Sequence, residues 1–233
     1  GETTGDHRFV FELPDGSKPM NLEMSDMFGN PPKTVMRDVT VERSYADCET
    51  EESRLEEYLN DVLSLEAVAC KDWLTNKVDR SITGKIARQQ CQGELQLPLS
   101  DCGVVALDYN GKKGIATSIG HAPQAALADS GAGSVLAIAE ALTNIVGAPL
   151  DGGLSAVSLS ANWMWPCRNE GEDAALYRAV KACSDFACAL GINIPTGKDS
   201  LSMTQKYGDD KVMAPGTVCL LYTSPSPRDG ATS

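Results

Sequence analysis

The dipeptide Asn110-Gly111 stands between two apolar runs, residues 103–109 and 114–120, and it constrains the fold more than any other feature. Asn-Gly favours the two-residue turn of a β-hairpin, because both residues tolerate positive φ. The two runs therefore predict a pair of antiparallel strands.

The segments after this hairpin alternate between helix and strand patterns. A run of small apolar residues predicts a helix whose first half is weakened by Gly131 and Gly133. The next helix is amphipathic and stops at Gly191, as expected of a C′ glycine. The predicted elements are, in order, a helix at 123–147, a buried strand at 157–161, a helix at 172–190 and a short strand at 192–195. This order predicts an α+β or α/β layer fold with a mixed sheet packed by helices.

The chain divides into four parts by pattern. Residues 1–48 are predicted to be the tail of a preceding unit, and the acidic, amphipathic stretch 49–70 a linking helix. Residues 71–220 form the main domain. Residues 221–233 are rich in Ser and Pro and are expected to be a non-native tail. The first residue is not Met, which favours a piece of a longer chain.

Composition excludes several classes of protein. The formal net charge of −12 over 233 residues argues against a nucleic-acid surface. No apolar run is long enough for a membrane span. The eight cysteines form no C-x-x-C pair, and only two histidines occur, which disfavours a zinc site. We expect free, mostly buried thiols and a cytoplasmic location.

Three polar clusters interrupt the apolar segments. Glu140 and Asn144 are four residues apart on a predicted helix, so their oxygens share one face and could bind Mg²⁺, although a solvated helix face has the same spacing. Asp101 precedes the hairpin, where it is either a metal ligand or a turn residue. Lys198 and Asp199 follow Gly197 after a strand, where they could meet a ligand or form an exposed turn.

Six ordered motifs carry a resemblance to one family, and a seventh segment, residues 32–39, agrees with it. The motifs are Asp79-Arg-Ser-Ile-Thr-Gly84, Leu97-Pro-Leu-Ser-Asp-Cys102, Glu140-Ala-Leu-Thr-Asn144, Leu159-Ser-Ala-Asn-Trp-Met164, Gly171-Glu-Asp-Ala174 with Leu176-Tyr177, and Gly197-Lys-Asp-Ser-Leu-Ser-Met203. With these motifs the chain resembles phosphoribosylformylglycinamidine synthase in its large, single-chain form with a fused glutaminase, over roughly residues 19–218.

The resemblance implies an activity and a fold. The family is a carbon–nitrogen ligase of purine biosynthesis with glutamine as amido donor. ATP phosphorylates the amide oxygen of formylglycinamide ribonucleotide, and ammonia from the glutaminase displaces the phosphate to give formylglycinamidine ribonucleotide. The synthetase consists of two halves of the aminoimidazole-ribonucleotide-synthetase type. This chain would be the tail of the first half and the N-terminal domain of the second, inactive alone, with the remaining synthetase and glutaminase domains as its partners.

The resemblance also implies site residues. Asp101, Glu140 and Asn144 are similar to the family's Mg²⁺ ligands at an ADP or ATP site. Ser100 would contact the nucleotide through its backbone, and Lys71 would meet the phosphates. In the large enzymes this site resembles an auxiliary, structural one, so no catalytic residue is assigned.

Four further residues have open roles. Asp79 and Arg80 could contact substrate phosphate, link the halves or form a buried ion pair, and Lys198 and Asp199 could lie beside the ligand. Two alternatives to the ligase remain: a non-catalytic Mg²⁺–nucleotide module of that enzyme, or a related ATP-using synthetase.

Overall fold

A computed structural model describes residues 1–233 except 30–31, 67, 71–83, 98–99 and 227–233. The chain divides into two compact units, Gly1–Arg37 and Asp38–Ser233. In the described part of the first unit the elements are β1 (Arg8–Phe11), β2 (Met20–Glu23) and α1 (Met24–Phe28). β1 and β2 pair as an antiparallel hairpin in which Phe9 lies opposite Leu22. None of the described residues of this unit is buried.

The second unit contains the remaining elements. They are η1 (Glu52–Arg54), α2 (Leu55–Ser64), β3 (Ile86–Arg88), β4 (Cys102–Ala106), β5 (Gly114–His121), α4 (Pro123–Ala128), α5 (Ser130–Ile145), η2 (Gly153–Ala156), β6 (Ser158–Met164), α6 (Glu172–Leu190), β7 (Asn193–Ser200), β8 (Thr204–Tyr207), β9 (Asp210–Met213) and β10 (Thr217–Ser226). Within the described residues, no helix is both long and apolar enough to cross a membrane.

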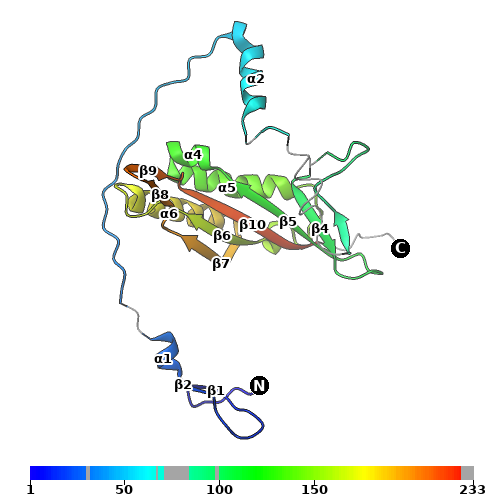
Figure 1. Cartoon of the computed structure of the whole chain (residues 1–233). Helices are drawn as coiled ribbons and strands as arrows, with labels where there is room; N and C mark the ends of the chain where they lie inside the picture. The colour runs from blue at the N-terminus through cyan, green and yellow to red at the C-terminus, as the bar shows by residue number, and fades with distance from the viewer. Residues whose placement is uncertain (30–31, 67, 71–83, 98–99, 227–233) are drawn as a thin grey trace. The chain divides into compact units, whose positions relative to one another are not determined.

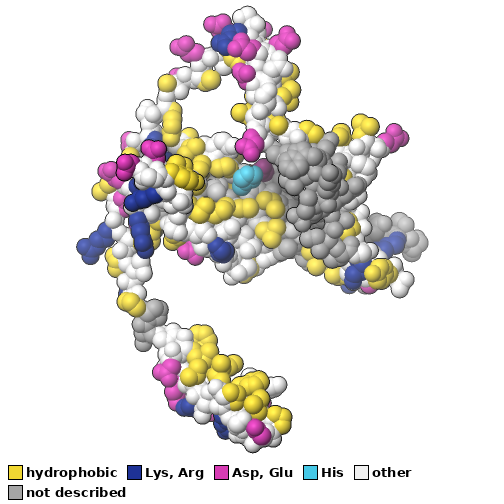
Figure 2. Space-filling model, viewed as in Figure 1, with side chains coloured by type: hydrophobic (Ala, Val, Ile, Leu, Met, Phe, Trp, Pro, Cys, Tyr) yellow, Lys and Arg dark blue, Asp and Glu magenta, His cyan; other side chains and the backbone are white. Residues whose placement is uncertain are grey.

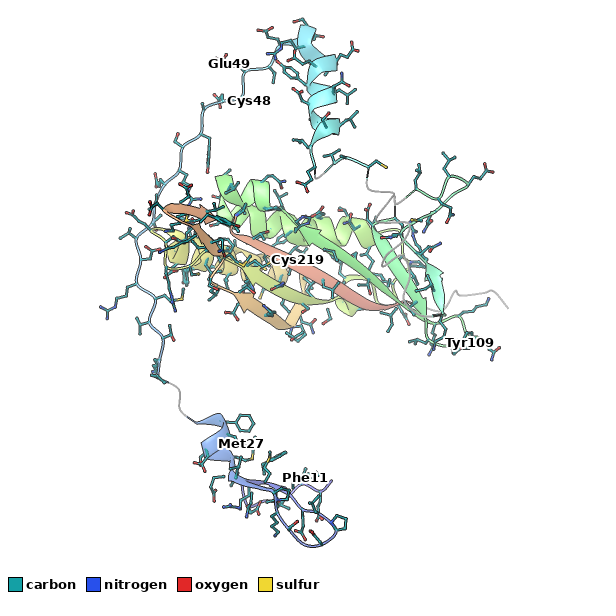
Figure 3. All side chains as sticks on the ribbon, viewed as in Figure 1. Phe11, Met27, Cys48, Glu49, Tyr109 and Cys219 are labelled. Atoms are coloured by element: carbon teal, nitrogen blue, oxygen red, sulfur yellow. The ribbon has the colours of Figure 1, made fainter. Side chains whose placement is uncertain are left out.

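Six strands form one sheet in the order β3-β4-β5-β10-β6-β7, and β8 and β9 pair separately. Only β6 and β7 run parallel among the paired strands described, so the sheet is mixed, as predicted. Figure 1 shows α5 and α6 lying along this sheet, and Figure 3 shows Cys219 in β10, within the sheet. The predicted hairpin is confirmed as β4 and β5, which pair from Cys102–Ser118 to Ala106–Gly114. Its connection is the longer loop 107–113 rather than a two-residue turn, and neither Asn110 nor Gly111 adopts a positive φ.

The core lies between the sheet and the two long helices. Ile138 of α5, Leu159 of β6 and Leu220 of β10 are among its fully buried side chains. On β5 the burial alternates, because successive side chains of a strand point to opposite faces. Ala116 and Ser118 face the helices, and the Ser118 hydroxyl donates to the carbonyl of Ala141 on α5 at 2.7 Å. One face of the sheet is therefore sealed by helix packing.

Two glycines allow the helical layer to approach closely. A Cβ on Gly120 of β5 would overlap the backbone of Ala137 and Ala141. A Cβ on Gly133 of α5 would lie 2.5 Å from the Cβ of Ala126 on α4. Small residues at such contacts permit backbones to pack without an intervening side chain. Here they bring α5 onto β5 and α4 onto α5.

Three predicted elements differ from those observed. The helix predicted at 123–147 is two helices, because Asp129 is extended and its side chain accepts from the Ala132 N–H as the N-cap of α5. The turn weighed for residues 197–199 is instead part of β7, paired with β6. β10 continues to Ser226, so its backbone pairing enters the segment predicted to be a tail.

The predicted helix in residues 49–70 is found as η1 and α2. Its apolar side chains are largely exposed, including Leu55, Leu59 and Leu63. Figure 2 shows hydrophobic side chains along one side of α2. The helix predicted from the amphipathic pattern is therefore confirmed.

Candidate functional site

Glu140 and Asn144 both reach from α5 to the end of β5. Oε2 of Glu140 accepts a hydrogen bond from the backbone N–H of His121 at 2.6 Å, and Nδ2 of Asn144 donates to the carbonyl of Ile119 at 2.8 Å. The four-residue spacing thus places both side chains on one helix face, as the sequence predicts. Because Nδ2 makes this bond, a cation could be held by Asn144 only through Oδ1, the acceptor atom of the amide.

Gly120 is the reason that both side chains can reach the strand. It lies between Ile119 and His121, and any Cβ there would overlap the α5 backbone. The absent side chain lets the helix sit directly on β5. Sequence reasoning did not single out this glycine, although its place at the end of an apolar strand was visible.

Asp101 lies beside the same end of β5. It is exposed and immediately precedes β4, whose first residue, Cys102, pairs with Ser118. Continuing that antiparallel register by one residue puts the Asp101 backbone level with Ile119, one strand spacing away, about 5 Å. Opposite residues of antiparallel strands share a face, so this register would put the Asp101 side chain on the exposed face of Ile119, away from α5. Of the three predicted metal ligands, the structure brings Glu140 and Asn144 together.

Ser100 is bound within the protein. Its hydroxyl accepts from Nε of Arg88 at 2.8 Å and from Nε2 of Gln92 at 3.2 Å, and it donates to the carbonyl of Cys102 at 3.0 Å. Its backbone N–H donates to the carbonyl of Gln90. A backbone contact from Ser100 to a nucleotide would therefore use its carbonyl oxygen. These bonds fix the chain just before Asp101.

Lys198 and Asp199 are not beside Glu140. They lie on β7, whereas Glu140 contacts β5. In the sheet β10 and β6 lie between these two strands, so β5 and β7 are three strand spacings apart, about 14 Å. Nζ of Lys198 donates to Oγ of Ser200 at 2.6 Å. The backbone of Gly197 lies so close to the carbonyl of Ala161 on β6 that a Cβ would overlap it. This close approach of the two backbones explains why the residue is glycine. Lys71, Asp79 and Arg80 lie outside the described residues.

An open cleft of about 500 Å³ adjoins Glu140. Its walls are the end of β5, the first residues of α4 and one face of α5. The lining residues are His121, Ala122, Gln124, Ala125, Leu136, Ala139, Glu140 and Thr143. A volume of this size falls within the range of small-molecule sites. Of the three predicted metal ligands, Glu140 lines the cleft.

The donor set is compatible with a hard cation. Asp101, Glu140 and Asn144 offer two carboxylates and one amide oxygen, the ligand types that Mg²⁺ combines with water and phosphate oxygens. Among the described residues, no three His, Cys, Asp or Glu side chains gather into a metal cluster. A cation at this end of β5 would therefore need the amide of Asn144 or ligands from elsewhere.

Comparison with known proteins agrees with this fold. Phosphoribosylformylglycinamidine synthase of Homo sapiens is 47% identical over 174 residues, which is 75% of this chain and 13% of the relative. Its counterpart in Drosophila melanogaster is 38% identical over 218 residues, 90% of this chain and 15% of that protein. The chain therefore spans a small part of the curated relatives it matches.

Solved structures show the same fold. PurLQS from Thermotoga maritima aligns with a TM-score of 0.55 at 16% identity, covering 91% of this chain and 31% of that one. Phosphoribosylformylglycinamidine synthase II from the same organism has a TM-score of 0.51 at 15% identity and covers 95% and 32%. The family profile described as "FGAR-AT PurM_N-like domain" matches residues 70–224. This chain belongs to the FGAR-AT PurM_N-like domain family.

Proposed function

We propose that this chain provides a Mg²⁺–nucleotide site to a phosphoribosylformylglycinamidine synthase, the ligase that uses ATP and glutamine-derived ammonia to convert formylglycinamide ribonucleotide to formylglycinamidine ribonucleotide. The observation that carries the proposal is the joint placement of Glu140 and Asn144 at the end of β5. Asp101 immediately precedes the neighbouring strand β4. The relatives named above bear that enzyme's name. A structure of T. maritima PurL complexed with ATP aligns with a TM-score of 0.50.

The chemistry of the site fits phosphate binding through a metal ion. A net charge of −12 disfavours direct binding of a polyphosphate, so a cation is needed between the carboxylates and the phosphates. When bound, Mg²⁺ would neutralise phosphate charge. The protein's part is to hold Glu140 and Asn144 rigidly, through bonds to the backbone of β5, so that little is lost in ordering them.

The site is proposed to hold nucleotide rather than to turn it over. Glu140 and Asn144, the predicted metal-binding residues on α5, are both hydrogen-bonded to β5, and α5 packs closely on that face of the sheet. Such a rigid arrangement suits a nucleotide that stays bound. Nucleotide bound here would stabilise the folded state by mass action. Turnover in the whole enzyme would require the other synthetase parts and the glutaminase.

Calorimetry tests the metal site. ADP is titrated into this chain with Mg²⁺ and again with EDTA, for the natural protein, Glu140→Gln and Asn144→Ala. We expect Mg²⁺-dependent binding that weakens about tenfold or more in each variant, equivalent to about 1.4 kcal/mol. Glu56→Gln on the exposed helix α2 is the matched control and should bind as the natural chain does. Equal affinity in Glu140→Gln would remove Glu140 from the site.

A turnover assay tests the second point. The chain is incubated with ATP, ammonia and formylglycinamide ribonucleotide, and phosphate release is followed. We expect Mg²⁺-dependent nucleotide binding without product. Product formation by the chain alone would show that it carries catalytic groups.

A further inference from the structure

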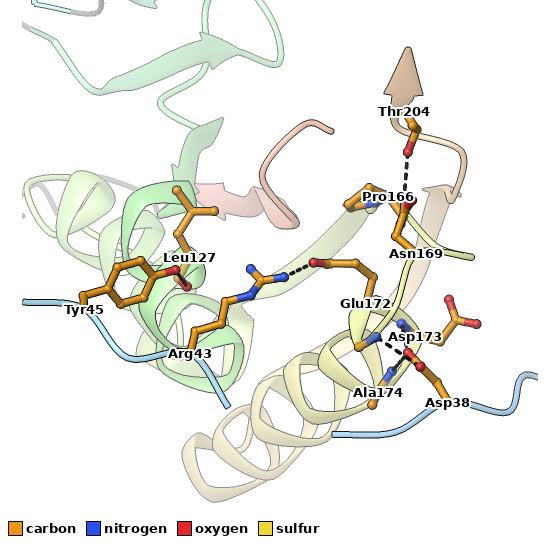
Figure 4. Close-up of polar contacts among 11 residues, drawn as sticks. Asp38, Arg43, Tyr45, Leu127, Pro166, Asn169, Glu172, Asp173, Ala174 and Thr204 are labelled. Atoms are coloured by element: carbon orange, nitrogen blue, oxygen red, sulfur yellow. Dashed lines mark hydrogen bonds and ion pairs between the residues drawn. The ribbon is translucent and has the colours of Figure 1, made fainter. Parts of the chain in front are cut away.

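Residues 38–45, named the strap here, cross from the start of α6 to the end of α4. The carboxylate of Asp38 accepts hydrogen bonds from the backbone N–H groups of Gly171 at 3.0 Å, Asp173 at 3.0 Å and Ala174 at 3.3 Å (Figure 4). The N-cap of α6 is Gly171, which has no capping side chain of its own. Asp38 therefore supplies the cap from more than 130 residues away.

The middle of the strap packs against the same end of α6. A Cβ on Gly171 would lie 2.7 Å from Cγ2 of Val41, so the glycine leaves space for the strap. Arg43 forms an ion pair with Glu172, whose side chain is only 5% exposed. A buried carboxylate is costly without a partner, so this pair favours the docked strap over a released one.

The end of the strap reaches α4. The hydroxyl of Tyr45 donates to the carbonyl of Leu127 at 2.8 Å, and Figure 4 shows Tyr45 beside Leu127 while Arg43 points to Glu172. Through these contacts the strap connects two helices that are far apart in sequence. α4 is a six-residue helix, too short to hold its place by its own hydrogen bonds.

α4 lies between two cavities. Its last residues, Ala126 to Ala128, line a cavity of about 320 Å³ together with Val41, Glu42 and Arg43 of the strap. Its earlier residues, Gln124 and Ala125, line the larger cleft that contains Glu140. α4 also begins two residues after His121, whose N–H binds Glu140. A shift of α4 would therefore change the wall of that cleft and the position of the His121 N–H.

We propose that the strap positions α4 and thereby shapes the nucleotide site beside Glu140, so that Asp38, Arg43 and Tyr45 are positioning residues for ligand binding. The inference rests on the proposed function for its ligand. It links the segment leading from residues 1–37 to the occupancy of the site. Docking of the strap and binding of nucleotide then favour one another, because both favour the same place for α4.

Tyr45→Phe is the sharpest variant, because it removes one hydroxyl and keeps the ring. Amide hydrogen exchange of the α4 peptide is measured by mass spectrometry, and ADP binding with Mg²⁺ is measured by calorimetry. We expect exchange in α4 to rise at least threefold and ADP affinity to fall about fivefold. Exchange at the end of α6, residues 183–190, should not change. Tyr207→Phe, in the exposed β8–β9 hairpin, is the control.

Asp38→Ala and Asp38→Asn provide a second comparison. Asn retains an oxygen acceptor, so it should restore part of the ADP affinity that Ala loses, while the midpoint of global unfolding distinguishes loss of fold from loss of position. The inference is overturned if α4 exchange and ADP affinity match the natural chain in both Tyr45→Phe and Asp38→Ala. It is also overturned if the natural chain binds ADP and the variants show raised exchange in α4 but the same ADP affinity as the natural chain. Absence of nucleotide binding in the natural chain would instead reject the proposed function, and the exchange data would still decide whether the strap holds α4.

Discussion

The carboxylate of Glu140 and the backbone N–H of His121, 2.6 Å apart, join the middle of α5 to the last residue of β5. In the contacts that the structure describes, Oε2 of Glu140 is the engaged oxygen, with the His121 N–H and, at 3.9 Å, with Nδ1 of the same residue. The proposed site requires this one side chain both to hold the helix to the sheet and to present an oxygen to a ligand. These two roles are separable by substitution.

Glu140→Gln and Glu140→Leu should separate structure from binding. Gln keeps an oxygen acceptor for the His121 N–H, so its free energy of unfolding should stay within about 0.5 kcal/mol of the natural chain. Leu leaves that N–H without its partner and should cost about 1 kcal/mol. Urea unfolding gives both values. Equal stability for the two variants would show that the bond to His121 contributes nothing.

Gly120→Ala should be strongly destabilising. The added Cβ would overlap the backbone of Ala137 and Ala141, and backbone cannot move aside as a flexible side chain does. We expect a loss of about 3 kcal/mol or more, at the upper end of overpacking effects. Gly103→Ala, on the neighbouring strand β4, has open space around its Cβ and is the control. Similar stabilities by urea unfolding would refute the close approach of α5 to β5.

Two neighbours on α5 test the position of the core. Ile138 is fully buried, whereas Leu136 is 49% exposed. Truncating the buried side chain leaves a cavity, so Ile138→Ala should cost about 2–5 kcal/mol. Leu136→Ala should cost well under half of that, as measured by the shift in denaturant midpoint. A reversed order would mean that α5 presents a different face to the sheet.

Sequence patterns predicted the elements whose signals are local. The bounds of α6, Glu172–Leu190, follow from an amphipathic period that ends at Gly191, which adopts φ +69°. The β4–β5 hairpin was predicted from its Asn-Gly signal and from the apolar runs on either side, although its connection is longer than the two-residue turn that the signal favours. Each signal lies within the element that it specifies, so no knowledge of tertiary contacts is needed.

Elements that depend on distant partners were predicted less well. Residues 197–199 looked like a turn because Gly-Lys-Asp is polar, but pairing with β6 supplies the backbone bonds that make them a strand. The sequence predicted one continuous helix at 123–147, because the break at Asp129 lies within a run of small apolar residues. For the site, the spacing of Glu140 and Asn144 predicted their shared face, whereas their contacts with β5 depend on packing at Gly120. The strap was not predicted, because Asp38 and Gly171 are remote in sequence.

Thiol reactivity should follow burial. Burial raises the pKa of the Cys183 thiol to about 11 and, together with Asp173, that of Cys167 to about 12. The thiolate is the reactive species, so at pH 8 these two should react slowly with a disulfide reagent. The exposed thiols Cys48, Cys70 and Cys188 should react first, and all eight should react in denaturant. Fast labelling of Cys183 in the native chain, identified by mass spectrometry, would contradict the packing of α6.

The stabilising effect of Asp38 should depend on pH in one direction. Its hydrogen bond from the Gly171 N–H, with further bonds from backbone N–H groups, lowers the pKa of the carboxyl below its ordinary value of 3.8. A group whose pKa is lower in the folded state stabilises fully above its unfolded pKa and loses that contribution as the pH falls through the folded value. The difference in denaturant midpoint between the natural chain and Asp38→Asn should therefore be constant from pH 7 to about 5 and shrink below about pH 4. Subtracting the denaturant midpoint of the variant from that of the natural chain cancels the contribution of other carboxylates, such as Asp108, whose pKa is also lowered. A difference that grows in acid would mean that Asp38 is not the charged cap of α6.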